Sequence, residues 1–193
     1  MKKPNAYNET QAGGGYIPVA VGGHYAIIKR AEERQDKNGR DMVVVAIDFD
    51  QQDAQAGYMA TSFANDVRPN KKWPNSGMKY ISVLGWQSSD CSKDFKGFCE
   101  AVEKSNKGFT INWEAKDWCA QFANKKVGVV YGNVESEYNG KTSIRPEIRW
   151  FCPYDKVAEA VIPRDKLLNK QVSDDNHIPA GPASAPVDDD CPF

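Results

Sequence analysis

The sequence predicts a mainly β fold, a five-stranded barrel with one or two helices, followed by a disordered acidic tail. Short segments rich in β-branched and aromatic residues recur along the chain. Two pairs of these segments are joined by Asn-Gly, the strongest short signal for a β-hairpin. A clear helical period occurs once, near the middle of the chain. The C-terminal residues are rich in Pro, Ala, Ser and Asp, and such a segment buries too little apolar surface to offset its ordering entropy.

The first hairpin is expected near the N-terminus, after a loose arm formed by residues 1–22. A strand begins at His24, and the turn that follows it contains Asn38-Gly39. The second strand alternates, so that one face carries four apolar side chains. These are Val43, Val45, Ile47 and Phe49. The end of the arm, residues 15–21, is expected to pack on the body.

The middle of the chain is predicted to contain two short strands, a loop and the main helix. Residues 58–63 and 79–84 are strand-like, and residues 68–77 form a loop because of their Pro, Asn and Gly content. The helix spans Lys93–Ser105, and Ser92 can cap its first turn. Its buried face is formed by residues spaced i, i+3, i+4 and i+7. These are Phe95, Phe98, Cys99 and Val102.

A shorter helix and a second hairpin complete the predicted body. The helix covers residues 116–123 and buries apolar side chains. Strands at residues 127–134 and 144–151 are joined through Asn139-Gly140. Four tryptophans are expected in the core, namely Trp86, Trp113, Trp118 and Trp150.

The resulting order is strand, hairpin, strand, strand, helix, strand, hairpin, strand. A helix between the third and fourth strands of a five-stranded barrel is the arrangement of the oligonucleotide/oligosaccharide-binding (OB) fold. In that fold the loops between strands 1–2 and 4–5 flank the ligand groove, and here these loops are the two Asn-Gly turns. Another small β-barrel or a β-sandwich is the alternative. The predicted divisions are an arm (1–22), an OB-like body (23–165) and a disordered linker with an acidic end (166–193).

The net charge of −1 conceals a division between the body and the tail. Of the 26 acidic residues, five lie from Val172 onward, where no Lys or Arg occurs. The rest of the chain therefore holds 25 basic and 21 acidic residues, a net charge of +4 against −5 for the tail. This division predicts a polyanionic partner for the body and a different partner for the tail.

The sequence carries no signal for a cofactor, a structural metal or a membrane span. The five cysteines are odd in number and form no Cys-x-x-Cys pair, and only two histidines could join a zinc site. Free thiols in a reducing compartment are therefore expected. No run of about 18 apolar residues occurs, and the N-terminal residues lack an apolar signal core. We expect a cytoplasmic protein without cofactors.

Two regions combine cations with aromatic side chains, as sequence-tolerant binding of single strands requires. The first region contains Arg68, Lys71, Lys72, Trp73, Lys79 and Tyr80. The second region is the late hairpin, and it contains Tyr131, Tyr138, Lys141, Arg145 and Arg149. In such sites the cations contact phosphates and the flat rings stack on bases. A solvated sheet face with ordinary aromatic packing is the alternative interpretation.

Signals for catalysis are weak. No phosphate-binding glycine loop and no His-Glu-x-x-His pair is present. No Ser or Cys motif identifies a catalytic partner for His24. Asp48 and Asp50 are candidate Mg²⁺ ligands of a nuclease, but without further placed carboxylates they indicate the end of a strand. No catalytic or metal-binding residue is predicted, and a metal-dependent nuclease is kept as an alternative function.

The last six residues form the most specific pattern in the chain. They are Asp188, Asp189, Asp190, Cys191, Pro192 and Phe193. The ring of Phe193 can enter an apolar pocket while its carboxylate meets an Arg or Lys at the rim. The aspartates can contact a basic surround, and Pro192 lowers the entropy lost on ordering. This chemistry predicts a segment that docks on partner proteins.

This ending resembles the C-terminal tip of bacterial single-stranded DNA-binding proteins, in which about three acids precede Ile-Pro-Phe. Five of the six positions match Asp-Asp-Asp-Ile-Pro-Phe, and Cys191 replaces the usual isoleucine. In that family the tip follows a flexible linker and recruits replication, recombination and repair proteins. The smaller side chain of Cys191 implies weaker docking.

The body is similar to single-stranded DNA-binding proteins encoded by phages or prophages. The similar residues are 23–33, Asn38-Gly39 and 43–49. This resemblance implies a viral replication or recombination setting, at the nucleoid in the host cytoplasm. The sequence thus predicts a non-enzymatic protein that coats single-stranded DNA and recruits partners through its tip. An adaptor whose tail mimics the host tip is the alternative, and homo-oligomerisation stays open.

Overall fold

The two Asn-Gly turns form the two long β-hairpins that the sequence predicts. In the first turn, the Asp36 carboxylate accepts a hydrogen bond from the Asn38 N–H at 2.7 Å, and Gly39 has a φ of 75°. In the second turn, Asn139 (φ 51°) and Gly140 (φ 72°) both have the left-handed conformation that Asn and Gly tolerate best. Local turn chemistry therefore determines both hairpins.

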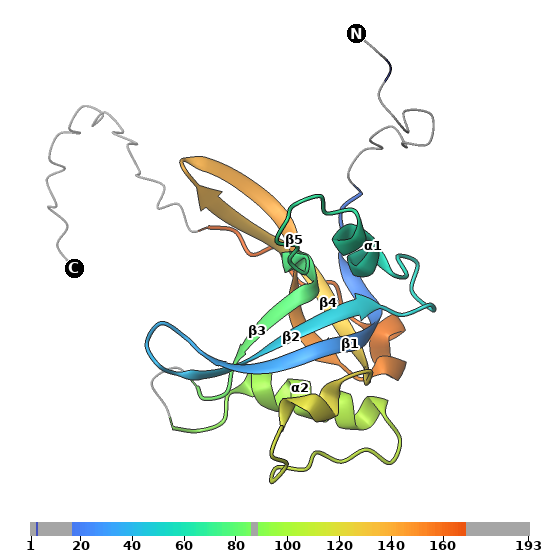
Figure 1. Ribbon diagram of the computed structural model, residues 1–193, viewed down its shortest axis with the longest axis vertical. Coiled ribbons are helices and arrows are strands. Elements are labelled where there is room, and N and C mark those ends of the chain that lie inside the picture. The colour runs from blue at the N-terminus through green and yellow to red at the C-terminus, as the bar shows by residue number, and fades with distance from the viewer. Residues whose placement is uncertain (1–2, 4–16, 86–88, 169–193) are drawn as a thin grey trace, which may run out of the picture.

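The computed structural model describes Lys3 and residues 17–85 and 89–168, and within them five antiparallel strands form one sheet (Figure 1). The strands are β1 (Gly22–Gln35), β2 (Asp41–Phe49), β3 (Met78–Ser82), β4 (Lys126–Tyr138) and β5 (Lys141–Cys152). Their order across the sheet is β3-β2-β1-β4-β5, so β3 and β5 are its edges. The prediction of a mainly β protein is confirmed.

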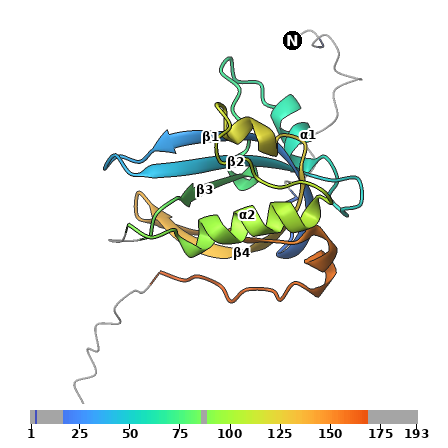
Figure 2. The same ribbon diagram turned by 90° about the horizontal axis from the view of Figure 1, so that it is seen from below.

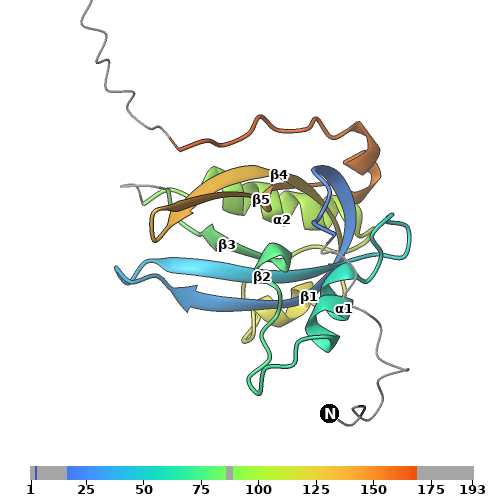
Figure 3. The same ribbon diagram turned by 90° about the horizontal axis from the view of Figure 1, so that it is seen from above.

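The sheet is folded over so that its two hairpins lie in separate layers. β1 pairs with β4 through residues 22–27 and with β2 through residues 26–35. Figure 3 shows β1 and β2 in one layer, β4 and β5 in the other, and β3 between them. Side chains from both layers, such as Val45 and Phe151, belong to a single apolar core.

Two β-bulges bend the strands around this core. The register of β1 against β2 shifts between Ile28 and Arg30. In the β4–β5 ladder the register also shifts, and Arg149 on β5 is passed over. An extra residue of this kind bends its strand and increases the local twist. As a result Ile148 and Phe151, three positions apart, both contribute to the core.

The main helix, α2 (Lys93–Ser105), has the bounds that the sequence predicts. The Ser92 hydroxyl accepts a hydrogen bond from the Phe95 N–H at 3.1 Å and so caps the first turn. The predicted face is buried: Phe95, Phe98, Cys99 and Val102. The helix packs against β3, β4 and β5, and Figure 2 shows it between the layer of β1 and β2 and the strand β4.

The prediction of a strand at residues 58–63 is wrong, because these residues form the helix α1 (Tyr58–Ala64). Gly57, with a φ of 68°, turns the chain into the helix. The carboxylate of Asp48 on β2 then accepts a hydrogen bond from the Met59 N–H at 3.0 Å, which satisfies one of the free donors of the first turn. A short apolar run does not reveal a cap that comes from another strand.

Three short 3-10 helices complete the described elements: η1 (Asn75–Gly77), η2 (Cys119–Phe122) and η3 (Tyr154–Glu159). The second of them lies within the predicted helix at residues 116–123 and is shorter than that prediction. None of the helices in the described part of the chain is long and apolar enough to cross a bilayer.

The prediction of four core tryptophans is wrong for two of them. Trp113 is 62% exposed and Trp150 is 40% exposed. Trp113 lies in the irregular segment before η2, where its ring stacks on the half-buried Trp118 with 5.3 Å between the ring centroids. Irregular segments have no periodicity from which burial can be predicted. Trp86 lies outside the described residues.

The segments that precede β1 and follow η3 in the chain pack onto the strands and helices. The Tyr58 hydroxyl donates to the Ile17 carbonyl at 2.7 Å. After η3, Lys166 pairs in parallel with Val134 on β4. The packed residues therefore extend slightly beyond the predicted body at each end. Residues 1–2 and 4–16 of the predicted arm lie outside the described residues, as do residues 169–193, which include the predicted tip at 188–193.

A buried polar network ties β1 to the loop after β2. Asp53 accepts hydrogen bonds from the N–H groups of Tyr25 and Gln55, both at 2.9 Å. Its carboxylate lies 3.1 Å from Nδ1 of His24, whose ring stacks on Phe49. Burial alone would raise the pKa of Asp53, but the hydrogen bonds from His24 and the backbone outweigh burial, so this pKa lies below its ordinary value. His24 therefore has a structural role.

We expect the Asp53 network to make stability depend on pH in the acidic range. The folded-state pKa of Asp53 is lower than its unfolded value of about 3.9. The ionised carboxylate therefore stabilises the fold above that pH, and this stabilisation is lost as the pH falls through the folded-state pKa. Asp53→Asn should lower the free energy of unfolding at neutral pH by about 1–3 kcal/mol.

Urea denaturation at several pH values measures this effect. The difference between Asp53→Asn and the wild type should shrink as the pH falls below about 4 toward the lower folded-state pKa, at which the wild type also loses its charge. Asp155→Asn, an exposed carboxylate on η3, is the control and should stay close to the wild type. A difference that is independent of pH would contradict the proposed role of the carboxylate charge.

Candidate nucleic-acid interface

A groove of about 740 Å³ crosses the outer face of β1, β2 and β3. β2 places Val45 and Ile47 in the core, so Ala46 between them faces outward and lines the groove. We call this surface the basic groove, and its lining residues are Lys29, Arg30, Arg34, Ala46, Phe63, Lys71, Lys72, Trp73, Asn75, Met78 and Tyr80. Five of these side chains are cations and none is a carboxylate.

The strand β1 contributes three groove cations that sequence reasoning missed, Lys29, Arg30 and Arg34. Arg30, Glu32 and Arg34 alternate along the strand and therefore share one face. The Glu32 carboxylate lies 3.0 Å from Arg30 and 2.7 Å from Arg34. It therefore holds both guanidinium groups over the outer face. The alternation is visible in the sequence, but nothing there shows that the connection before β3 forms the opposite wall.

Trp73 is held in the groove by the sheet beneath it. Its Nε1–H donates to the Ile47 carbonyl at 3.0 Å. Its ring centroid lies 5.6 Å from that of Phe63 on α1, and the side chain is half-buried against the core. Trp73 therefore lines the groove and also fixes the connection between α1 and β3.

Tyr80 has the most exposed aromatic ring of the groove. It is 54% exposed and lies opposite Val44 of β2. The exposed side chains of Lys71 and Lys72 come from the connection before β3. The Lys71 ammonium donates to the Ala64 carbonyl at 2.9 Å and lies 5.9 Å from the centre of the Phe63 ring. A ligand in the groove can therefore reach aromatic rings and ammonium groups together.

A second cavity, of about 690 Å³, continues the groove toward β5. We call it the cleft, and its lining residues are Tyr58, Ser62, Pro74, Asn75, Ser76, Met78, Lys79, Tyr80, Arg145, Pro146, Glu147 and Ile148. These residues come from α1, η1 and the two edge strands β3 and β5. Asn75, Met78 and Tyr80 line both cavities, so the basic groove and the cleft form one continuous surface.

Lys79 connects the two edges of the sheet at the cleft. Its Nζ donates to the carbonyls of Ile148 at 2.9 Å and of Arg149 at 3.3 Å, both on β5. Burial lowers the pKa of Lys79. Because this ammonium is half-buried and both of its hydrogen bonds go to β5, Lys79 connects β3 to β5. Its role as a phosphate contact stays a prediction.

Tyr131 belongs to the core, which corrects its prediction as a stacking residue. The side chain is fully buried opposite Ile148, and its hydroxyl donates to the Ser76 carbonyl at 2.6 Å. Its ring makes edge contacts with His24 and Phe49. Burial also raises the pKa of its hydroxyl. A base cannot reach this ring, because the strand register turns Tyr131 inward.

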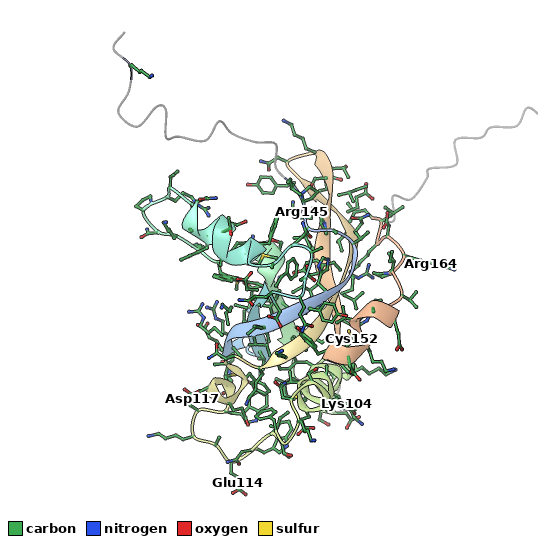
Figure 4. All side chains as sticks on the ribbon, turned by 90° about the vertical axis from the view of Figure 1, so that its right-hand side faces the viewer. Lys104, Glu114, Asp117, Arg145, Cys152 and Arg164 are labelled. Carbon is green, nitrogen blue, oxygen red and sulfur yellow. The ribbon has the colours of Figure 1, made fainter. Side chains whose placement is uncertain are left out.

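Two predicted arginines lie outside the groove and the cleft. Arg68 pairs with Asp66 at 2.7 Å, and this ion pair holds the pKa of Asp66 well below its ordinary value. Arg149 donates to the Arg164 carbonyl at 3.1 Å, in the segment that follows η3. Figure 4 shows Arg164 on that segment, beside the strands.

The β4–β5 hairpin brings Tyr138, Lys141 and Arg145 onto one face. Tyr138 is 76% exposed and lies opposite Lys141. Arg145 donates to the hydroxyls of Ser136 and Ser143, both at 3.2 Å, and lines the cleft. Of the eleven predicted binding residues, five therefore line the basic groove or the cleft with side chains that a ligand can reach. They are Lys71, Lys72, Trp73, Tyr80 and Arg145.

The carboxylates considered for a metal site have structural partners. Asp48 accepts hydrogen bonds from the N–H groups of Phe49 and Met59. Asp50 accepts a hydrogen bond from the Tyr154 hydroxyl, which lowers the pKa of Asp50. In the described part of the chain, no group of three or more His, Cys, Asp or Glu residues is placed to hold a metal ion.

Arg145 lies at the opposite end of the body from Lys104, Glu114 and Asp117 (Figure 4). The basic groove and the cleft together contain exposed cations beside aromatic rings, a combination that suits a flexible polyanion with flat bases. The sequence matches no protein-family model and no curated protein. Its function is therefore inferred from the chemistry of this surface.

Trp73→Phe tests whether the groove tryptophan is also structural. The variant keeps an aromatic ring but leaves the Ile47 carbonyl without its indole donor. We expect the free energy of unfolding to fall by about 1–2 kcal/mol, measured by urea denaturation. Tyr80→Ala removes an exposed ring and should stay within about 0.5 kcal/mol of the wild type. Unchanged stability in Trp73→Phe would show that this hydrogen bond contributes nothing.

Proposed function

We propose that the protein is a non-enzymatic single-stranded DNA-binding protein that coats and protects DNA during replication, recombination or repair. The observation that carries the proposal is the continuous surface of the basic groove and the cleft, where exposed cations lie beside aromatic rings. In proteins that bind single strands, cations follow the phosphates and rings stack on unpaired bases.

The strand order supports an OB-like barrel for the body. α2 lies between β3 and β4 in the chain, and Lys79 connects β3 to β5, the two strands that would complete a barrel. In the OB fold the ligand lies against the face of strands 2 and 3, between the loops that join strands 1–2 and 4–5. The corresponding loops here are the two Asn-Gly turns.

The accessible rings favour single strands over duplex DNA. A ring stacks on a base only where the face of that base is open, and in a duplex each base is covered by its neighbours. Tyr80 offers such a ring, and Trp73 and Phe63 line the same groove. Stacking accepts every base, so this mode of binding suits a protein that coats DNA of any sequence.

Titration with an unlabelled oligothymidine, followed by tryptophan fluorescence, tests the proposal. The wild type should show saturating quenching. Tyr80→Ala should weaken binding by about 1–3 kcal/mol, because one stacked base is lost. Lys72→Ala should lower the slope of log K against log salt by about 0.7, which corresponds to one phosphate contact on a single strand.

Lys104→Ala removes a cation from the exposed face of α2, outside the groove and the cleft, and is the matched control. It should leave both the affinity and the salt slope close to wild type. If Tyr80→Ala and Lys72→Ala also bind like the wild type, the DNA lies on another surface. No binding by the wild type at low salt would instead favour a protein-binding adaptor.

The acidic tail carries the second half of the proposed function, the recruitment of partner proteins. Three aspartates precede Cys191, Pro192 and Phe193, in a pattern that resembles the partner-binding tip of bacterial single-stranded DNA-binding proteins. DNA bound to the cationic body would repel this acidic segment and leave it free to bind other proteins.

Calorimetry against a bacterial protein that binds such tips tests recruitment. Phe193→Ala should abolish binding to that partner, because the ring enters its apolar pocket. Cys191→Ile should strengthen binding, since a larger apolar side chain buries more surface, at about 25 cal/mol per Å². Oligothymidine affinity should stay unchanged in both variants. If Phe193→Ala binds the partner as tightly as the wild type, the recruitment proposal is wrong.

A further inference from the structure

Glu147 carries the one carboxylate on a surface whose other charged side chains are all cations. The basic groove has five cations, and the cleft adds Lys79 and Arg145. Glu147 on β5 is the one acidic residue among the lining residues of the two cavities. A carboxylate repels the phosphates of a nucleic acid. We therefore expect Glu147 to contact a part of the ligand other than phosphate.

The oxygens of Glu147 are free to accept hydrogen bonds from a ligand. The side chain is exposed, and among the described residues its carboxylate makes no hydrogen bond or ion pair. The positive charge of Lys79 acts on it, but the hydrogen bonds of that ammonium go to the carbonyls of Ile148 and Arg149. The acceptor capacity of the Glu147 carboxylate is therefore unused within the described residues.

The rest of the cleft has the form of a base-binding site. Its volume of about 690 Å³ accommodates a nucleoside. The partly exposed ring of Tyr80 lies at the junction with the basic groove and can stack on a base. The side-chain amide of Asn75 lines both cavities and has no hydrogen-bond partner among the described residues. The cleft therefore offers a ring, two acceptor oxygens and an amide donor.

Guanine is the base whose edge matches these groups. Its Watson–Crick edge carries two neighbouring donors, N1–H and the N2 amine, followed by the O6 acceptor. The two oxygens of one carboxylate can accept both donors, and an amide N–H can donate to O6. Adenine and cytosine place an unprotonated ring nitrogen beside their single amine, and thymine places its N–H between two carbonyls. In these three bases an acceptor faces the carboxylate.

We propose that the cleft is a base-reading subsite in which Glu147 selects guanine in single-stranded DNA. This inference rests on the proposed function, because it requires that a single strand lies along the basic groove. Bases elsewhere along the groove would be held without selection, by stacking and by contacts to their phosphates. The protein would then bind all single strands but prefer those that place a guanine in the cleft.

Competition binding with oligonucleotides of about 15 nucleotides tests the subsite. An oligothymidine with isolated guanines should bind the wild type about tenfold more tightly than plain oligothymidine, the effect of one bidentate base contact. Hypoxanthine at the same positions lacks the N2 amine, and adenine lacks both donors of the guanine pattern. Both substitutions should lose most of the preference, which separates the contact from the better stacking of a purine.

Glu147→Gln keeps the size of the side chain but replaces one acceptor oxygen with a donor. Its preference for guanine should fall to about the level seen with adenine. Glu137→Gln removes the same charge from the same hairpin, outside the cleft, and should keep the tenfold preference. Thermal melting confirms that both variants are folded, as their exposed side chains lead us to expect.

The possible results separate the guanine subsite from the proposed function on which it rests. If the wild type binds oligothymidine but gains nothing from guanine, the subsite is wrong and the proposed function stands. A preference that persists in Glu147→Gln also overturns the subsite, because another group then reads guanine. If none of these oligonucleotides binds, the proposed function itself is wrong.

Discussion

The architecture depends on β1, which pairs with β4 in its first half and with β2 in its second half. Because it belongs to both ladders, β1 holds the two hairpins in one sheet and also sets the angle between them. The bulge after Ile28 lies just beyond the last pair with β4, where β1 leaves one neighbour and continues with the other. The half of β1 that β4 does not cover carries Arg30 and Arg34, two of the groove cations.

This division of β1 explains why the basic groove lies where it does. β2 runs between β1 and β3 and is buried on both faces from Val43 to Phe49. The core covers one face, and the long side chains of β1 and β3 cover much of the other. Arg30, Arg34 and Tyr80 therefore shield outward-facing apolar residues such as Val44 and Ala46 while their polar ends reach solvent. Groove chemistry and sheet stability thus involve the same side chains.

Features determined by neighbouring residues could be predicted from the sequence, and features determined by distant residues could not. The Asn-Gly hairpins and α2 depend on their own turn residues, period and cap, and their prediction was confirmed. The helix α1 was missed because its cap comes from Asp48 on another strand. Tyr131 was misassigned because its inward orientation follows from the register of β4 and β5, which residue composition does not show. The acidic tip stays a prediction.

The same distinction between neighbouring and distant residues applies to the candidate site. Trp73 and the neighbouring lysines could be found because cations and an aromatic ring stand together in a Pro/Asn-rich loop. The opposite wall of the groove comes from β1, and only the folded sheet brings the two walls together. Lys79 shows the converse: it stands beside Tyr80 in the sequence, but its ammonium is bound to carbonyls of β5. Proximity in sequence thus identified the candidates, and the folded structure shows which of their side chains are exposed and which are already bonded within the protein.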